Sequence, residues 1–229
     1  MQPLTTEMKN FIEYGTEERR WEFKPPMAWT KGRVKKKFEI TKAVLALSNI
    51  SGGGNIIFGI FQKRDRSNGI EFEKRGLNTR QFNTFNNEDD IGRFLNGKAS
   101  QELKFEIFGG EVENLHKKFI ILKIYESKKA YPVICTQDYP TKDNKCRLNK
   151  GYLYIRSISN PIESRSILSA EEWDELILRL LTRKEEIIYK DLNAICSNLK
   201  TKKKQPIITK KKSKLSSSKY EAVLKRDKL

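Results

Sequence analysis

The sequence predicts an α+β domain in which a mixed β-sheet is flanked by helices, followed by a basic disordered tail. Residues 38–49 carry apolar side chains at helical spacing and lead through three glycines into the nearly all-apolar segment 55–61. A helix that ends at a glycine turn and is followed by a strand buried on both faces is typical of a layered domain. In several short segments after residue 103, apolar and polar residues alternate as they do in strands. These segments are therefore expected to add strands to the sheet.

Local patterns place the elements before and after this centre. Residues 4–14 are expected to form a helix, and residues 19–24 a strand that ends at Pro25. Residues 27–37 are expected to form a basic loop. Further strands are expected over residues 70–74, 103–108, 119–125, 131–136 and 151–157, the second and third of them joined through the Gly109 and Gly110 region.

Capping residues mark the later helices. Asn87 is expected to cap a helix over residues 88–96. Ser169 and Glu172 form a predicted capping box for a helix that runs through Leu181. The expected organisation is therefore a domain over residues 1–184, a separate C-terminal helix over 185–199 and a Lys-rich, disordered tail over 200–229.

The charge of the chain favours an anionic partner. The formal net charge is +17, and residues 200–229 alone contribute twelve Lys or Arg against two acids, a charge of +10. Such a surface favours DNA, RNA or an anionic membrane, and a Lys-rich tail adds salt-dependent affinity for nucleic acid. Membrane insertion is not expected, because no apolar run is long enough to span a bilayer.

The few cysteines and the single histidine limit the kinds of catalytic site that the chain can form. Cys135, Cys146 and Cys196 lack CxxC spacing, so free thiols and a reducing, cytoplasmic location are expected; a nuclear location is the alternative for a eukaryotic source. His116 is the single histidine and is expected in a hairpin turn, which makes a histidine-based catalytic site improbable. Any catalysis would rely on carboxylates, lysines and a metal.

A combination of motifs resembles the Schlafen AlbA-type domain, a nucleic-acid-binding fold, over roughly residues 10–182. The residues that carry the resemblance are Glu17, Glu22 and Lys24, then Ala46 to Asn49, Gly52 to Gly54, Gly59, and finally Tyr154 with Arg156. The resemblance implies an endoribonuclease acting on tRNA or rRNA, with two glutamates from the first strand and an aspartate just after the central strand. Glu17 and Glu22 occupy the glutamate positions, but Phe61 and Gln62 stand where the aspartate is expected, and Asp65 is the nearest acid.

Two functions follow from this comparison. One is a nucleic-acid-binding protein that cleaves structured RNA with Mg²⁺ or Mn²⁺, with Glu17, Glu22 and Asp65 as metal ligands and Lys24 stabilising charge on the phosphate. The other is a non-catalytic DNA- or RNA-binding accessory or regulatory module, which the missing acid favours. RNA is the favoured ligand and DNA the alternative, while a homodimer or a protein partner stays open.

The spacing of the two glutamates sets a geometric condition. On an uninterrupted strand Glu17 and Glu22 would face opposite sides, because they are an odd number of residues apart. They converge only if Glu17 lies in the turn before the strand or if a bulge intervenes. Lys24 shares the face of Glu22, and the ordinary alternative is a surface Glu–Lys pair of little energetic value.

A basic segment beside the predicted acids is expected to bind the nucleic-acid backbone. Trp29 is expected to stack on an unpaired base, and Arg156 to contact a phosphate or to close a structural ion pair. A solvated charge run is the alternative for the basic segment. The predicted cationic contacts are Arg33, Lys35, Lys36, Lys37 and Lys42, extended by Lys63, Arg64 and Arg66.

The glycine-rich turn is interpreted as structural. A phosphate-binding loop places Gly-Lys-Ser/Thr at the start of a helix, where backbone amides hold the phosphate. Here Gly52, Gly53 and Gly54 follow a helix and precede a strand. A tight reversal with close packing is therefore expected.

Overall fold

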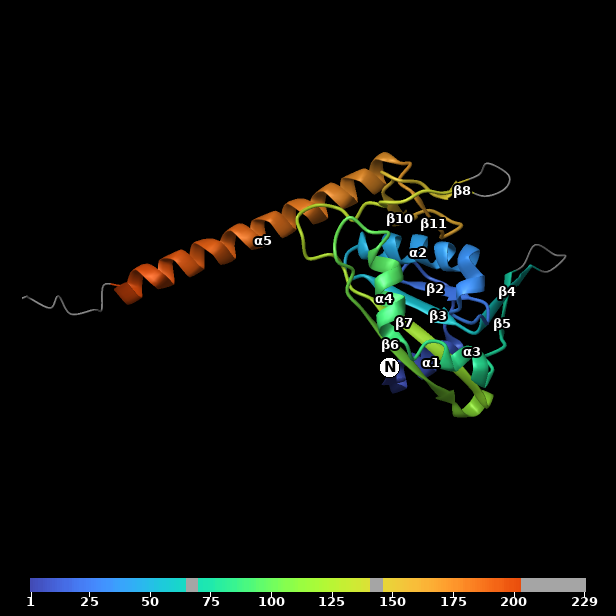
Figure 1. The fold of residues 1–229 in the computed structure, drawn as a ribbon. Coiled ribbons are helices and arrows are strands. Elements are labelled where there is room, and N and C mark those ends of the chain that lie inside the picture. Colours follow the sequence, from blue (N-terminus) through green and yellow to red (C-terminus); the bar gives the residue numbers. More distant parts are fainter. Residues whose placement is uncertain (65–69, 141–145, 203–229) are drawn as a thin grey trace, which may run out of the picture. The chain divides into compact units, whose positions relative to one another are not determined.

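The fold, seen in a computed structural model that describes residues 1–64, 70–140 and 146–202, is mixed α+β with helices flanking a mixed sheet (Figure 1). The sheet has the strand order β1-β6-β7-β3-β2. Strands β2 and β3 are parallel, β3 and β7 antiparallel, β7 and β6 antiparallel, and β6 and β1 parallel. Its strands are Gln2–Pro3 (β1), Trp21–Lys24 (β2), Gly54–Phe58 (β3), Phe105–Val112 (β6) and Lys117–Ile124 (β7).

Three two-stranded sheets complete the strand set of the described residues. The pair β4–β5 continues from β3, since the chain turns at Gly59 with a φ of +117° and enters β4 directly. The pair β10–β11 supplies Arg156 to the site described below. The pairs are Ile60–Arg64 with Ile70–Lys74 (β4, β5), Tyr139–Pro140 with Cys146–Leu148 (β8, β9), and Tyr154–Arg156 with Ser164–Ser166 (β10, β11).

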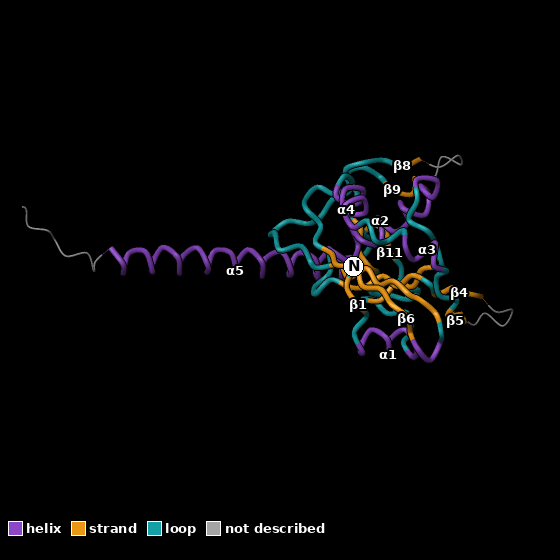
Figure 2. The backbone as a smooth tube through the Cα atoms, turned by 60° about the horizontal axis from the view of Figure 1, so that its bottom comes forward, coloured by secondary structure: helices purple, strands orange, loops and turns teal. Residues whose placement is uncertain are grey.

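Helices cover both faces of the main sheet, as Figure 2 shows with α1 on one side and α2 and α4 on the other. Helix α2 is buried from Lys37 to Ser48 except at Glu39 and Lys42, because β10 and β11 lie against its outer side while its inner side meets the sheet. Among the described residues, no helix has the length and hydropathy that a membrane crossing requires. The helical segments are Thr6–Tyr14 (α1), Lys31–Arg33 (η1), Val34–Ser48 (α2), Thr79–Asn83 (α3), Glu88–Asn96 (α4), Glu113–Leu115 (η2) and Ala170–Lys202 (α5).

Two apolar clusters occupy the two sides of the sheet. The larger one joins α2 and α4 to β3 and β7, with Val44, Leu47 and Ile56 fully buried. The smaller one joins α1 to the opposite face, with Ile12, Ile57 and Ile121 fully buried. Neighbouring residues Ile56 and Ile57 thus serve opposite clusters, which is why this strand is apolar on both faces.

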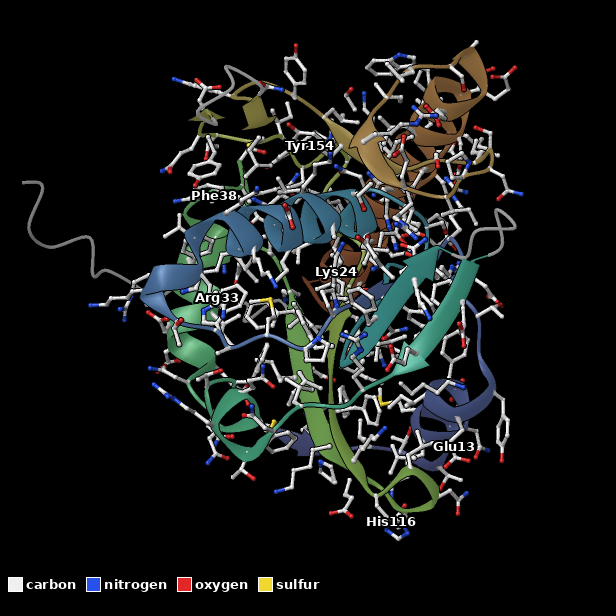
Figure 3. The ribbon with its side chains drawn as sticks, turned by 90° about the vertical axis from the view of Figure 1, so that its right-hand side faces the viewer. Glu13, Lys24, Arg33, Phe38, His116 and Tyr154 are labelled. Carbon is white, nitrogen blue, oxygen red and sulfur yellow. The ribbon has the colours of Figure 1, made fainter. Side chains whose placement is uncertain are left out.

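Several expected elements are confirmed. Asn87 accepts a hydrogen bond from the Asp90 backbone and caps α4 at the expected boundary. Ser169 and Glu172 exchange the two hydrogen bonds of a capping box at the start of α5. His116 lies in the turn between β6 and β7, with a left-handed φ of 48° (Figure 3). Cys135 is buried with a free thiol, as expected.

Other expectations were wrong, each for a local reason. Residues 34–37 belong to α2 and not to a loop, and the helix begins with a basic first turn. Gly109 and Gly110 lie inside β6, where a Cβ on Gly109 would come within 2.7 Å of Ile120 Cδ1. Residues 131–136 make only isolated bridges at Ile134 and Cys135.

The chain after Ser169 forms one helix where two were expected. Helix α5 is continuous over Ala170–Lys202, without the expected break near residue 182. The chain nevertheless divides into two compact units, Met1–Glu186 and Ile187–Leu229. The tail beyond residue 202 lies outside the described residues.

Candidate nucleic-acid interface

A tight turn before β2 brings the two predicted glutamates together. Glu18 and Trp21 exchange backbone hydrogen bonds of 3.1 and 3.0 Å, so Arg19 and Arg20 form the tip of the turn. Glu17 and Glu22 are the next residues outward on the two arms. The condition set by their odd spacing is therefore met, because Glu17 precedes the strand and lies across from Glu22.

Glu22 is a buried carboxylate surrounded by donors. It is 4% exposed, and one oxygen accepts hydrogen bonds from Arg156 Nη1 at 2.9 Å and from Ser164 Oγ at 2.7 Å. Its other oxygen forms an ion pair with Lys24. Both oxygens are thus occupied by groups from this chain.

Arg156 joins strand β10 to β2 and to the turn that precedes β2. Its side chain is 1% exposed, and it donates to Glu22, to Glu17 Oε1 at 3.5 Å, and to the Glu18 and Arg19 carbonyl oxygens at 3.2 and 3.3 Å. Of the two roles predicted for Arg156, the structural ion pair describes these contacts. The guanidinium contacts both carboxylates, offsets part of their charge and fixes the turn that holds them.

The pKa values of the two glutamates shift in opposite directions. Burial acts to raise the pKa of Glu22, but the charges of Lys24 and Arg156 outweigh it and hold that pKa below its ordinary value. Burial raises the pKa of Glu17, and Arg156 only partly offsets this effect. Burial lowers the pKa of Lys42, against the attraction of Glu163 and Glu22. The ionised form is therefore favoured by folding at Glu22 and disfavoured at Glu17.

These opposite shifts predict opposite pH effects. The folded-state pKa of Glu22 lies below 4.5, so its contribution to stability is present above pH 4.5 and is lost as the pH falls through the folded value. For Glu17 the folded-state pKa lies above 4.5, so its contribution is present at lower pH and is lost as the pH rises through that value. Compared with wild type, Glu22→Gln should lose less unfolding free energy on acidification and Glu17→Gln should lose more, as measured by urea unfolding between pH 3 and 7. Identical pH dependence in all three proteins would contradict the assignment.

The glutamates line a polar cavity of about 460 Å³. Glu39 and Lys42 reach it from α2, Gln62 from β4, and Glu163 and Ser164 from the β10–β11 segment. Figure 3 shows Lys24 beneath α2 and beside the β4–β5 pair. Glu39, Glu163 and Ser164 were not predicted, while Gln62 stands at the position where the resemblance expects an aspartate. The signal for Glu39 was its position three residues before Lys42, on the same face of a helix.

Two of the three predicted metal ligands, Glu17 and Glu22, come together, and the third lies outside the described residues. Among residues 1–64, 70–140 and 146–202, no three His, Cys, Asp or Glu side chains come together as metal ligands. The carboxylate of Glu22 already faces Arg156, Lys24 and Ser164, so a cation would have to displace charged donors there. Asp65, the third predicted ligand, and Arg66 lie outside the described residues, as does the side chain of Arg64.

Four of the predicted basic contacts do not line the cavity. Arg33, Lys35 and Lys63 are exposed, and Lys36 is half-buried. Lys35, Glu39 and Lys42 follow one another at helical spacing, so one face of α2 leads from its N-terminal turn to the cavity. Arg33 stands at the N-terminal end of this helix (Figure 3).

Two predicted contacts are wrong because the side chains are buried. Trp29 is 4% exposed and packs against Phe85 and Phe94, so it is not placed to stack on a base. Lys37 is 4% exposed, and its ammonium lies 4.7 Å from the centre of the Trp29 ring and 3.9 Å from Asp90. Both residues belong to the interior beneath α2.

The glycine turn after α2 binds a carboxylate of the chain itself. The Gly52 backbone N–H donates to Glu126 Oε2 at 2.9 Å. Gly52 and Gly53 have left-handed φ values of 75° and 68°, which glycine adopts most readily. The structural interpretation of this turn agrees with these contacts.

The neighbouring motif Ser48-Asn49 is also structural. The Asn49 amide donates to the Val133 and Tyr154 carbonyl oxygens at 2.8 and 3.0 Å, and its oxygen accepts from the Val133 N–H at 2.8 Å. One side chain thereby ties α2 to two distant segments.

Comparison with known proteins identifies the family. The family described as Schlafen, AlbA_2 matches residues 17–161, more than half of the 229-residue chain. The chain belongs to the Schlafen AlbA_2 family. This confirms the resemblance drawn from the sequence motifs, and the family indicates a nucleic-acid-related role. No curated protein matches the sequence.

Two solved structures resemble this Schlafen AlbA_2 chain remotely. The crystal structure of DIP2311 from Corynebacterium diphtheriae is 16% identical with a TM-score of 0.39, and the match covers 69% of this chain and 23% of that one. The solution structure of the N-terminal domain of a RecG-related protein from Nitrosomonas europaea is 15% identical with a TM-score of 0.37, covering 72% of this chain and 94% of that one. The chain thus spans about a quarter of the length of the DIP2311 protein.

Proposed function

We propose that this protein binds nucleic acid, with RNA favoured over DNA, through cations on and near α2. The observation that carries the proposal is the face of α2 that runs from Lys35 in the exposed N-terminal turn, past Glu39, to Lys42 in the cavity. Arg33 and Lys63 add exposed positive charge, on the segment before α2 and on β4. Exposed cations along one path are suited to successive backbone phosphates.

The charge inside the cavity makes its interior a poor site for phosphate. Four carboxylates line the cavity, from Glu17, Glu22, Glu39 and Glu163, against the three cations Lys24, Lys42 and Arg156. An interior that carries this balance of charge does not attract a polyanion. The phosphates are therefore bound by Arg33, Lys35, Lys36 and Lys63, and the cavity receives at most a neutral or hydrogen-bonding part of the nucleotide.

Neutralising the cations at the start of α2 is expected to weaken nucleic-acid binding and to lower the salt dependence of that binding. The triple variant Arg33→Gln, Lys35→Gln, Lys36→Gln should bind a tRNA-sized structured RNA at least about tenfold more weakly. The slope of log K against log salt should become less negative by roughly 2, because two to three phosphate contacts are lost. Fluorescence anisotropy in several salt concentrations measures both, and a DNA duplex of matched length tests the RNA preference.

A charge-matched variant provides the control. Lys117, Lys128 and Lys129 are exposed and lie away from the glutamate cavity, so their replacement by glutamine removes the same charge. The control variant should keep most of the wild-type affinity. Equal weakening in both variants would show diffuse attraction to a basic protein and would refute an interface at α2.

RNA cleavage is a second candidate function, favoured by the four glutamates that line one cavity. The ion pairs that occupy Glu22 favour the binding function over it. Incubation of tRNA with the protein and Mn²⁺ or Mg²⁺, beside the Glu17→Gln and Glu22→Gln variants, distinguishes the two. If the wild type cleaves the RNA and both variants do not, the result would support catalysis. If the RNA stays intact with all three proteins, or is cleaved equally by all three, binding is left as the function.

A further inference from the structure

Helix α5 carries an exposed row of large apolar side chains. In the unit Met1–Glu186, Leu178 and Leu181 are 67% and 54% exposed. In the unit Ile187–Leu229, the same helix exposes Ile188, Leu192 and Ile195 by 49%, 54% and 55%. Side chains of this type are normally covered, and several together on one element mark an interaction surface.

Their spacing in the sequence is that of a coiled coil. Positions 178, 181, 185, 188, 192 and 195 are separated alternately by three and four residues, which is the a and d pattern of a heptad repeat. Only Glu185 is not apolar among these six positions, which we call the seam. A strict period of 3.5 residues favours packing against another helix of the same pattern over docking into a groove of a globular protein.

We propose that α5 pairs with the α5 helix of a second copy of this chain, in an antiparallel two-stranded coiled coil. In this register Leu178 lies opposite Ile195 of the second copy, and Leu181 opposite Leu192. Ile188 lies opposite Glu185. Each of the six seam positions then has a partner within the same set, as a two-fold symmetric interface requires.

The charges beside the seam determine the orientation. Lys184 and Asp191 both precede an a position, and both side chains are exposed. In the antiparallel register Lys184 of each copy lies beside Asp191 of the other, which forms two symmetric ion pairs. A parallel pair would instead place Lys184 beside Tyr189, which carries no opposite charge.

Glu185 makes the pairing reversible. A carboxylate at an a position reduces the stability of a coiled coil, while it restricts the register that the helices adopt. The dimer is therefore expected to be in equilibrium with the monomer at micromolar concentrations and to tighten when this charge is removed.

Sedimentation of the full chain tests the proposal. Between about 1 and 100 μM, a range that brackets micromolar dissociation constants, the wild type should show a concentration-dependent monomer–dimer equilibrium. Ile188→Glu should raise the dissociation constant at least about tenfold, and Glu185→Leu should lower it. Ile187→Glu is the matched control, because it places the same charge on the adjacent exposed isoleucine outside the seam.

Two results would overturn the proposal. A wild type that stays monomeric throughout this range would exclude self-association, and equal weakening by Ile187→Glu and Ile188→Glu would exclude the seam as its cause. Circular dichroism of each variant shows that α5 is still helical. For the orientation, Lys184→Asp and Asp191→Lys should each weaken the dimer while the double variant restores it; failure of the double variant to restore it would exclude the antiparallel register.

Discussion

Replacement of Arg156 by methionine is expected to destabilise the protein by about 3–5 kcal/mol, because it leaves the buried carboxylate of Glu22 without its guanidinium partner. Arg156 is 1% exposed and donates to two carboxylates and two carbonyl oxygens. Methionine fills a similar volume, so the loss reports on charge and hydrogen bonding more than on packing. Urea unfolding at pH 7 measures the change.

An exposed ion pair provides the control for this prediction. Arg75 pairs with Glu73 on the surface, with side chains 46% and 48% exposed. Arg75→Met is expected to leave the unfolding midpoint nearly unchanged, because exposed pairs are solvated in both states. If Arg156→Met were no more destabilising than Arg75→Met, Arg156 would not be the structural partner of Glu22.

Replacement of Gly53 by alanine is expected to cost roughly 2–5 kcal/mol, from a strained backbone together with overpacking. Its φ is +68°, and an added Cβ would lie 2.1 Å from the Ile124 carbonyl oxygen and 2.9 Å from the Glu126 nitrogen. Both neighbours are backbone atoms of β7 and the segment after it, so neither can rotate away. Thermal and urea unfolding should both show the loss.

Gly110→Ala is the matched control in the same domain. Gly110 lies in β6 without a left-handed φ, and its added Cβ would meet only Leu4 side-chain carbons at 3.7 Å or more. This variant is expected to be close to wild type in stability. Equal destabilisation by both alanines would mean that the turn after α2 tolerates a side chain as well as a strand does.

Sequence patterns predicted best those elements whose causes are local. Asn87 and the Ser169–Glu172 pair predicted helix starts because capping depends on residues three apart. Gly109 was wrongly predicted to lie in a turn. A glycine that allows a close neighbour inside a strand has the same sequence signature as a glycine in a turn. The basic first turn of α2 was taken for a loop, because its charges mask a helix that tertiary packing stabilises.

The candidate site was partly predictable. The convergence of Glu17 and Glu22 was stated as a condition and is met, but the occupant between them, Arg156, follows 134 residues after Glu22. No local pattern reveals such a contact. The same limit explains Trp29: its place beside a basic segment indicated a stacking platform, whereas distant Phe85 and Phe94 enclose it.

The link between Glu22 and Arg156 also governs the order in which this molecule can assemble. A ribosome makes Glu22 and its neighbouring counter-charge Lys24 early, but the guanidinium of Arg156 follows 134 residues after Glu22. Until then the buried carboxylate in β2 lacks one of its two cationic partners, so the nascent chain gains less by completing its sheet. Maturation of the domain consequently depends on a late, non-local contact, which is a feature of slowly folding topologies.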